Sequence, residues 1–234
     1  MNIDLLAIMA HPDDAELLVG GTLAKAARQG YNVGILDLTG GEGGSFGNAG
    51  TRAREAEHAA RILGVPTRLS AGLPDSKLEN TPAAREAVAR IIRELMPSSI
   101  ILHWPDARHP DHREASEIGR DACFIAGIGG GHRPSKILYS LTYQEAHVKP
   151  TFVVDVTDEM ATKLEAIFAF DSQFGGGKTS MGDVLGGSSR PLREQILAHH
   201  AHYGSLIRKD FGEPFFTRET VLIDDVVSLG VRSM

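Results

Sequence analysis

The chain has 234 residues, of which 42% are hydrophobic, and a formal net charge of −6 at pH 7. This length and composition are ordinary for a globular protein, and we expect residues 1–234 to form a single domain. The 24 basic residues are spread along the chain among 30 acidic ones, without the basic stripe that nucleic-acid binding requires. A nucleic-acid partner is therefore not expected.

The N-terminal residues and the cysteine content bear on the cellular location of the protein. Residues 1–10 have no positively charged start, and the sequence contains no apolar run of the roughly 20 residues needed to cross a bilayer. Cys123 is the only cysteine, so an intramolecular disulfide is impossible, and its apolar neighbours favour a buried side chain. We therefore expect a cytoplasmic protein without a membrane partner.

Strand and helix patterns alternate through the first hundred residues. The predicted strands cover residues 4–10, 31–38, 67–71 and 99–102, and the predicted helices between them cover residues 15–28, 51–63 and 82–96. Gly30 and Gly64 follow the first two helices, and Pro97 stops the third. Such alternation implies parallel strands with right-handed crossovers, so we predict a Rossmann-like three-layer α/β/α sandwich with a mostly parallel sheet.

The second half is less regular. We predict helices at 114–126, 158–170 and 191–209, strands at 135–143 and 151–156, and a short terminal segment at 213–223. Residues 39–50, with six glycines, and residues 175–189 read as loops. The first loop has no Gly-Lys-Ser/Thr ending and no GxGxxG pattern opening into a helix, so nucleotide binding is disfavoured.

Two motifs follow predicted buried strands and carry metal-binding residue types. His11-Pro12-Asp13-Asp14 lies between the first strand and the first helix, and His109-Pro110-Asp111-His112 comes soon after the strand at 99–102. The carboxyl ends of parallel strands meet at one crevice, where ligands bind in α/β folds. We predict a hydrolytic zinc centre with His11, Asp14 and His112 as ligands and an open position for water.

Each motif has a simpler explanation when it is taken alone. Asp13 or Asp14 could cap the first helix, and residues 109–112 could form a solvated turn. Two such motifs at the ends of two buried strands are better explained together by a metal site. Because Asp13 and Asp14 are adjacent, one could cap the helix while the other binds the metal.

The two motifs resemble the signature of the PIG-L/LmbE-like zinc-dependent N-deacetylases, which remove acetyl groups from N-acetylglucosaminyl compounds. Similar residues recur over nearly the whole chain, at 20–22, 41–42, 60–64, 72–75 and 212–215. Residues 108–112, 132–134, 149–155 and 172–174 further resemble the branch that acts on N-acetylglucosaminyl-malate in bacillithiol biosynthesis. One departure is Phe46, which stands where many members carry an arginine in the glycine-rich loop.

The resemblance implies one Zn²⁺ per chain, although another divalent metal is possible, and a small amino-sugar substrate. We expect Asp13 to be the general base and His109 the general acid or oxyanion stabiliser, with Asp111 holding His109. Substrate contacts are expected from the following residues: Arg52 at the sugar, Arg108 at a carboxylate such as malate, and Tyr203 at the oxyanion. Relatives are often hexamers, so a homo-oligomer is expected.

Alternative functions remain open at this point. Within the enzymes, the rival is a deacetylase of chitooligosaccharides or of another N-acetyl amino-sugar conjugate. From another class, the rival is a metal- or sugar-binding protein without catalysis, which would need neither a free carboxylate at Asp13 nor an acid at His109. The remaining histidines, including His103, His147 and His199, are expected to be structural or exposed.

Overall fold

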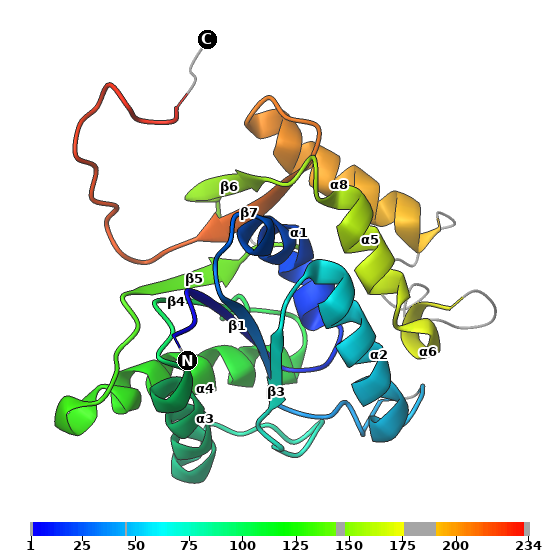
Figure 1. The fold of residues 1–234 in the computed structure, drawn as a ribbon, viewed down its shortest axis with the longest axis vertical. Helices are drawn as coiled ribbons and strands as arrows, with labels where there is room; N and C mark the ends of the chain where they lie inside the picture. The colour runs from blue at the N-terminus through cyan, green and yellow to red at the C-terminus, as the bar shows by residue number, and fades with distance from the viewer. Residues whose placement is uncertain (1, 45, 144–147, 176–190, 232–234) are drawn as a thin grey trace.

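The computed structural model describes residues 2–44, 46–143, 148–175 and 191–231 (Figure 1). A seven-stranded sheet runs through it in the order β3-β2-β1-β4-β5-β7-β6. Its strands are β1 (Leu5–Met9), β2 (Val33–Asp37), β3 (Thr67–Ser70), β4 (Ser99–Leu102), β5 (Lys136–Ser140), β6 (Phe152–Asp155) and β7 (Gly212–Phe216). The pairs from β3 to β5 are parallel, and β7 is antiparallel to both β5 and β6. The predicted α/β fold with a mostly parallel sheet is confirmed.

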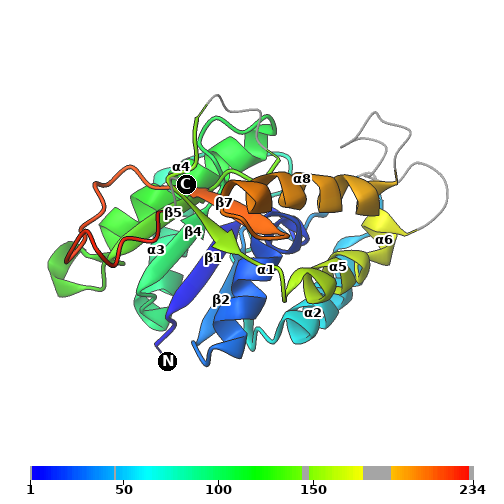
Figure 2. The same cartoon turned by 90° about the horizontal axis from the view of Figure 1, so that it is seen from above.

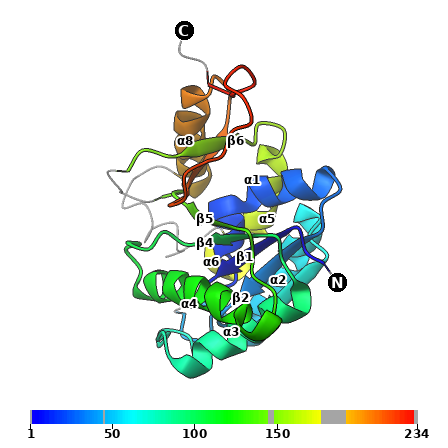
Figure 3. The ribbon, with the colours of Figure 1, turned by 90° about the vertical axis from the view of Figure 1, so that its left-hand side faces the viewer.

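Helices cover both faces of the sheet (Figure 2 and Figure 3). They are α1 (Asp14–Arg28), α2 (Ala49–Leu63), α3 (Pro82–Leu95), α4 (Pro110–Ala126), α5 (Met160–Phe168), α6 (Asp171–Phe174) and α8 (Leu192–Leu206), with a 3₁₀ turn at Ile128–Gly130. No helix among the described residues is long and apolar enough to span a bilayer.

Side chains of the central strands alternate between two hydrophobic clusters, one on each face of the sheet. Ala7 and Met9 of β1 pack with α1, α2 and α5, whereas Leu6 and Ile8 pack with α3 and α4. Because both faces are buried, the central strands are apolar at nearly every position. This explains why the segment at 4–10 is a continuous aliphatic run instead of an alternating one.

The differences from the sequence-based expectation that matter most for the fold and the site concern α4 and β7. Helix α4 begins at Pro110, four residues before the predicted start at 114, because proline suits the first helical turn and the His109 side chain caps it. Residues 212–216, expected as part of a terminal segment, form the strand β7 between β5 and β6. The second glycine- and serine-rich segment, apart from Gly175, lies outside the described residues, as does His147.

Candidate active site

The two motifs lie at the same edge of the sheet. Strand β1 ends at Met9 and β4 ends at Leu102, and these strands are parallel neighbours. The chain then turns into α1 on one side and α4 on the other, so each motif forms the entry to a helix. Ligating atoms of His11, Asp14 and His112 all lie within 4.8 Å of one another.

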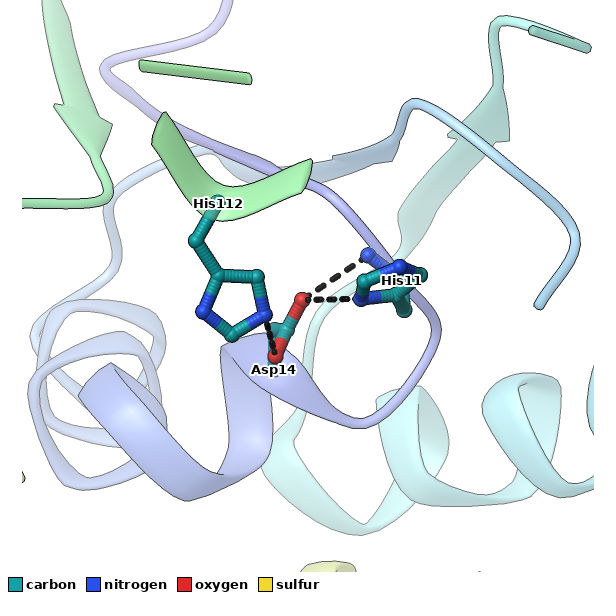
Figure 4. A group of neighbouring side chains, drawn as sticks. All are labelled: His11, Asp14 and His112. Atoms are coloured by element: carbon teal, nitrogen blue, oxygen red, sulfur yellow. Dashed lines mark hydrogen bonds and ion pairs between the residues drawn. The ribbon is translucent and has the colours of Figure 1, made fainter. Parts of the chain in front are cut away.

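The Asp14 carboxylate lies between the two imidazoles, as Figure 4 shows. His11 Nδ1 is 3.2 Å from Asp14 Oδ2, and His112 Nε2 is 3.1 Å from Asp14 Oδ1. The amide of His11 also donates to Asp14 Oδ2, at 2.8 Å, which fixes the carboxylate in this orientation. Burial opposes the charged form of Asp14, but the nearby His112 and His103 hold its pKa well below the ordinary value.

This group suits a divalent metal ion. Two imidazoles and one carboxylate form the kind of donor set found at catalytic zinc sites, where water or substrate occupies the fourth position. Burial lowers the proton affinity of His11, yet the carboxylates of Asp14 and Asp75 outweigh this and raise its pKa to about 11. These carboxylates therefore favour positive charge at this group, whether a proton on His11 or a metal ion supplies it.

Asp13 has a different environment from its neighbour Asp14. It precedes α1 with a φ of 115°, a strained value for a residue other than glycine, and its side chain makes no capping hydrogen bond. Asp13 is 5% exposed, and its carboxylate lies 2.7 Å from Arg52 Nη2. Burial raises the pKa of Asp13 to about 8, although Arg52 acts in the opposite direction. Helix capping by its side chain therefore does not explain Asp13.

Arg52, predicted at the sugar, is 4% exposed and lies on α2. Besides Asp13, its guanidinium donates to the carbonyl oxygens of Pro12 and of Gly41, the latter at 3.2 Å. The structure therefore places Arg52 between the proposed base and the glycine-rich loop. A contact from Arg52 to a substrate stays a prediction.

His109 and Asp111 interact differently from the expectation. The Asp111 backbone amide donates to His109 Nδ1 at 3.1 Å, whereas the Asp111 carboxylate faces His11 Nε2 at 3.2 Å. Asp111 therefore contacts His109 through its backbone amide, and its carboxylate contacts His11 instead. The His109 ring lies 4.8 Å from the His112 ring, centre to centre, and burial lowers the pKa of His109.

Sequence reasoning missed two residues of this site. His103, set aside as structural or exposed, is fully buried: its Nε2 accepts from the Ala10 amide at 2.9 Å, and its ring stacks on His112 at 4.1 Å. Asp75 lies 3.1 Å from His11 Nε2, measured from its Oδ1. Both residues come soon after the carboxyl end of a parallel strand, β4 or β3, which is the signal that identified His11.

The two remaining predicted residues lie further out. Arg108 is exposed at the approach to α4. Tyr203 on α8 packs against His199, whose Nε2 accepts from the Tyr143 amide beyond β5. This contact places α8 beside the end of β5, although none of the described contacts joins Tyr203 to the His-Asp-His group.

Comparisons with known proteins bear on this site. The PIG-L family model, described as GlcNAc-PI de-N-acetylase, matches residues 6–123, which include both motifs. A diacetylchitobiose deacetylase of Thermococcus kodakarensis is 32% identical over 187 residues, covering 73% of this chain and 70% of that protein.

A second relative covers less of the chain. A 1D-myo-inositol 2-acetamido-2-deoxy-alpha-D-glucopyranoside deacetylase of Catenulispora acidiphila is 31% identical over 160 residues, 54% of this chain and 53% of that one. A solved structure of a conserved protein from Thermus thermophilus has a TM-score of 0.83 and 33% identity, covering 94% and 97% of the two chains. With its family model, its relatives and its fold in agreement, this chain belongs to the PIG-L deacetylase family.

Proposed function

We propose that this protein is a metal-dependent hydrolase that removes the acetyl group from an N-acetylglucosaminyl conjugate. The observation that carries this proposal is the group of His11, Asp14 and His112 with the Asp13 carboxylate beside it, at one edge of the sheet. Membership of the PIG-L family and the named substrates of the two relatives support the amino-sugar class.

We assign the metal ligands to His11, Asp14 and His112, with Zn²⁺ as the proposed ion and another divalent metal as the alternative. An ion held there would polarise the acetamide carbonyl and lower the pKa of a water molecule. The ligands come from two loops about a hundred residues apart, which the parallel pairing of β1 and β4 brings together.

Asp13 is the proposed general base. Its carboxylate is buried and is not part of the proposed ligand set, so it can accept the proton of the attacking water. A base works best when its pKa is near the working pH, and burial moves the pKa of Asp13 upward in that direction. Arg52 keeps the carboxylate in place and limits how far its pKa rises.

His109 is the proposed general acid or oxyanion stabiliser. Since His109 Nδ1 accepts the hydrogen of the Asp111 amide, the neutral imidazole carries its proton on Nε2. No hydrogen bond to another described residue takes up that N–H, and we propose that it donates to the carbonyl oxygen on which negative charge develops. Tyr203 at the oxyanion, Arg52 at the sugar and Arg108 at a substrate carboxylate complete the proposed site.

For the substrate, we propose N-acetylglucosaminyl-malate, the substrate of the bacillithiol branch that the chain resembles. An exposed guanidinium at Arg108 suits the two carboxylates of malate. A chitooligosaccharide is the second candidate, favoured by the relative named diacetylchitobiose deacetylase. Deacetylation rates on the malate conjugate, N-acetylglucosamine and diacetylchitobiose decide between them, and a preference for diacetylchitobiose would overturn our choice.

Two alanine variants test the roles within the site. We expect Asp13→Ala to bind Zn²⁺ normally and to release acetate at least a hundred times more slowly, whereas Asp14→Ala loses Zn²⁺ binding. Full turnover by Asp13→Ala would show that the base is another residue. Absence of acetate release by the zinc-loaded wild-type protein would favour a binding protein without catalysis.

We also propose a homo-oligomer in the cytoplasm, with a hexamer as the form that the family resemblance suggests. The extended segment after β7 supports self-association, because several of its large apolar side chains are exposed: Val221, Leu222, Val226, Val227 and Val231. Light scattering would measure the mass in solution, and a monomeric mass would contradict the proposal.

A further inference from the structure

Two carboxylates converge on the outer edge of the His11 imidazole, opposite the edge that faces Asp14. His11 Nε2 is 3.2 Å from Asp111 Oδ2, with hydrogen-bond geometry, and 3.1 Å from Asp75 Oδ1. Both carboxylate residues are buried, Asp75 being 8% and Asp111 4% exposed. Their side chains come from different parts of the fold, the loop after β3 and the first turn of α4.

One backbone amide holds the two carboxylates together. The amide of Ser76 lies 2.7 Å from Asp75 Oδ1 and 2.8 Å from Asp111 Oδ2, the same oxygens that face His11. Ser76 has a φ of 60°, in the left-handed region that residues other than glycine rarely adopt. A local strain of this kind persists when surrounding contacts require it.

The same turn is tied to the glycine-rich loop. Asp75 Oδ2 accepts from the Gly43 amide at 2.7 Å, and the Asp75 amide donates to Glu42 Oε1 at 3.0 Å. These hydrogen bonds, one to its side chain and one from its backbone amide, therefore fix the position of Asp75. Asp75 Oδ1, which also accepts from the Ser76 amide, is thereby held against His11.

This arrangement determines which nitrogen of His11 carries the proton. Two carboxylates can only accept hydrogen bonds, so Nε2 must be the protonated nitrogen of a neutral His11. The lone pair of Nδ1 is then directed at Asp14, within the group that could hold a metal ion. A histidine ligand whose other nitrogen donates to a carboxylate is held in one orientation and becomes a stronger ligand.

We propose that Asp75 and Asp111 are positioning residues that hold His11 in the tautomer and orientation needed to bind the metal. This inference rests on the metal site proposed above. It gives the Asp111 carboxylate a role at His11 in place of the expected role at His109, and it adds Asp75 to the site. It also links the glycine-rich loop to the metal centre through the Asp75 side chain.

Zinc affinity without any substrate tests the proposal. We would measure it by competition with a chromophoric chelator for wild type, Asp75→Asn, Asp75→Ala and Asp111→Asn. Loss of such an outer carboxylate typically weakens metal binding about 10–100-fold. We expect that range for Asp75→Ala, and a smaller but measurable loss for Asp75→Asn and Asp111→Asn, each of which removes the charge but keeps an oxygen acceptor.

Two control variants keep the test specific. Ser76→Gly removes the side chain but keeps the amide and suits the φ of 60°, so its zinc affinity should equal that of wild type. Asp121→Asn makes the same chemical change elsewhere on α4, where Asp121 contacts Asn80 and Arg120, and should also leave zinc binding unchanged. Circular dichroism verifies that each variant is folded.

A second readout reports the tautomer itself. In zinc-loaded protein with ¹⁵N-labelled histidine, His11 should give an Nε2–H proton signal that shifts or vanishes in Asp75→Ala and Asp111→Asn. Wild-type zinc affinity together with an unchanged His11 signal in both variants would overturn the proposal. If the wild type binds zinc but deacetylates nothing, weaker zinc binding by the variants still supports this inference, and only the proposed function fails.

Discussion

Asp13 and Asp14 show how two adjacent identical residues acquire different chemistry. The unusual backbone at Asp13 directs its carboxylate toward Arg52, while Asp14, one residue later, lies among the imidazoles of His11, His103 and His112. Burial favours the neutral form of both carboxyls and therefore acts to raise both pKa values. The pKa of Asp13 is raised because burial, with the Asp14 and Glu16 carboxylates, outweighs Arg52, whereas the pKa of Asp14 is lowered because interactions with His112, His103 and His11 outweigh its burial.

Arg52 controls the protonation of the proposed base, and its removal has a predictable sign. Burial raises the pKa of Asp13 and the Arg52 charge opposes the rise, so Arg52→Gln should raise that pKa further. The unprotonated base is the active form. The acid limb of the kcat/KM profile should therefore move to higher pH in Arg52→Gln, whereas Arg52→Lys, which keeps the charge, should shift it less. A limb that stays in place or moves to lower pH would contradict this role.

Metal binding should release a proton from His11. The carboxylates around His11 outweigh its burial and raise its pKa to about 11 in the metal-free protein, so it is protonated at neutral and mildly alkaline pH. A histidine binds a metal ion only in its neutral form, so the bound proton must leave. Titration calorimetry in buffers of different ionisation enthalpy should show about one proton released per Zn²⁺ at neutral pH. Zinc binding without proton release would contradict the protonated state of His11.

At the scale of elements, α1 is held at its middle by side chains from distant strands and helices. The amides of Gly21 and Thr22 donate to Glu213 of β7 at 2.9 and 2.7 Å, and the Leu17 carbonyl accepts from Lys163 of α5 at 2.9 Å. Glycine is needed here, because a Cβ at Gly21 would lie 2.8 Å from the Val156 Cβ. The helix that begins with Asp14 is therefore anchored to two other elements.

Loss of the Lys163 charge should destabilise the protein strongly. Lys163 Nζ and Glu213 Oε1 are 2.6 Å apart and both side chains are fully buried, so Lys163→Met leaves the Glu213 carboxylate without a cation. Breaking such a pair typically lowers the free energy of unfolding by about 3–5 kcal/mol. Urea denaturation would measure this loss.

The control is the same substitution in an exposed pair. Lys209 lies 3.1 Å from Asp155, and the Lys209 side chain is 52% exposed, so Lys209→Met should change the free energy of unfolding by about 1 kcal/mol at most. Equal effects of the two substitutions would show that the buried pair contributes no more than the exposed one.

At the scale of the molecule, local patterns explain how much could be predicted from the sequence. Strands β1 to β4 and the helices between them were predictable, because each has its own apolar pattern and its own stop signal, such as Gly64 or Pro97. Strand β7 was not, since its place between β5 and β6 depends on pairing with segments about 60 and 75 residues away. Local patterns carry no information about such partners.

The same distinction applies to the site. His11, Asp14 and His112 were brought together in the prediction by a rule about strand ends, which needs no side-chain detail. The pairing of Arg52 with Asp13, and of the Asp111 carboxylate with His11, depends on side-chain directions at helix starts. For that reason the grouping of these residues could be predicted from the sequence, whereas part of their side-chain contacts could not.

A metal ion at this site should stabilise the whole fold. Its proposed ligands come from the entries to α1 and α4, helices on opposite faces of the sheet, so a bound ion connects both layers. An ion that binds only the folded state stabilises it by about 2.7 kcal/mol at a hundredfold excess over Kd. We expect Zn²⁺ to raise the Tm of the metal-free protein, and a strong chelator to reverse the rise.

Two isosteric variants separate ligation from a general effect of zinc on the protein. Asp14→Asn removes a proposed ligand charge, so its Tm should respond little to Zn²⁺. Asp13→Asn changes the neighbouring residue, whose carboxylate faces Arg52, and its Tm should rise with Zn²⁺ as in wild type. If Zn²⁺ raises the Tm of both variants equally, the ion binds elsewhere. The two helical layers would then be connected through the sheet alone.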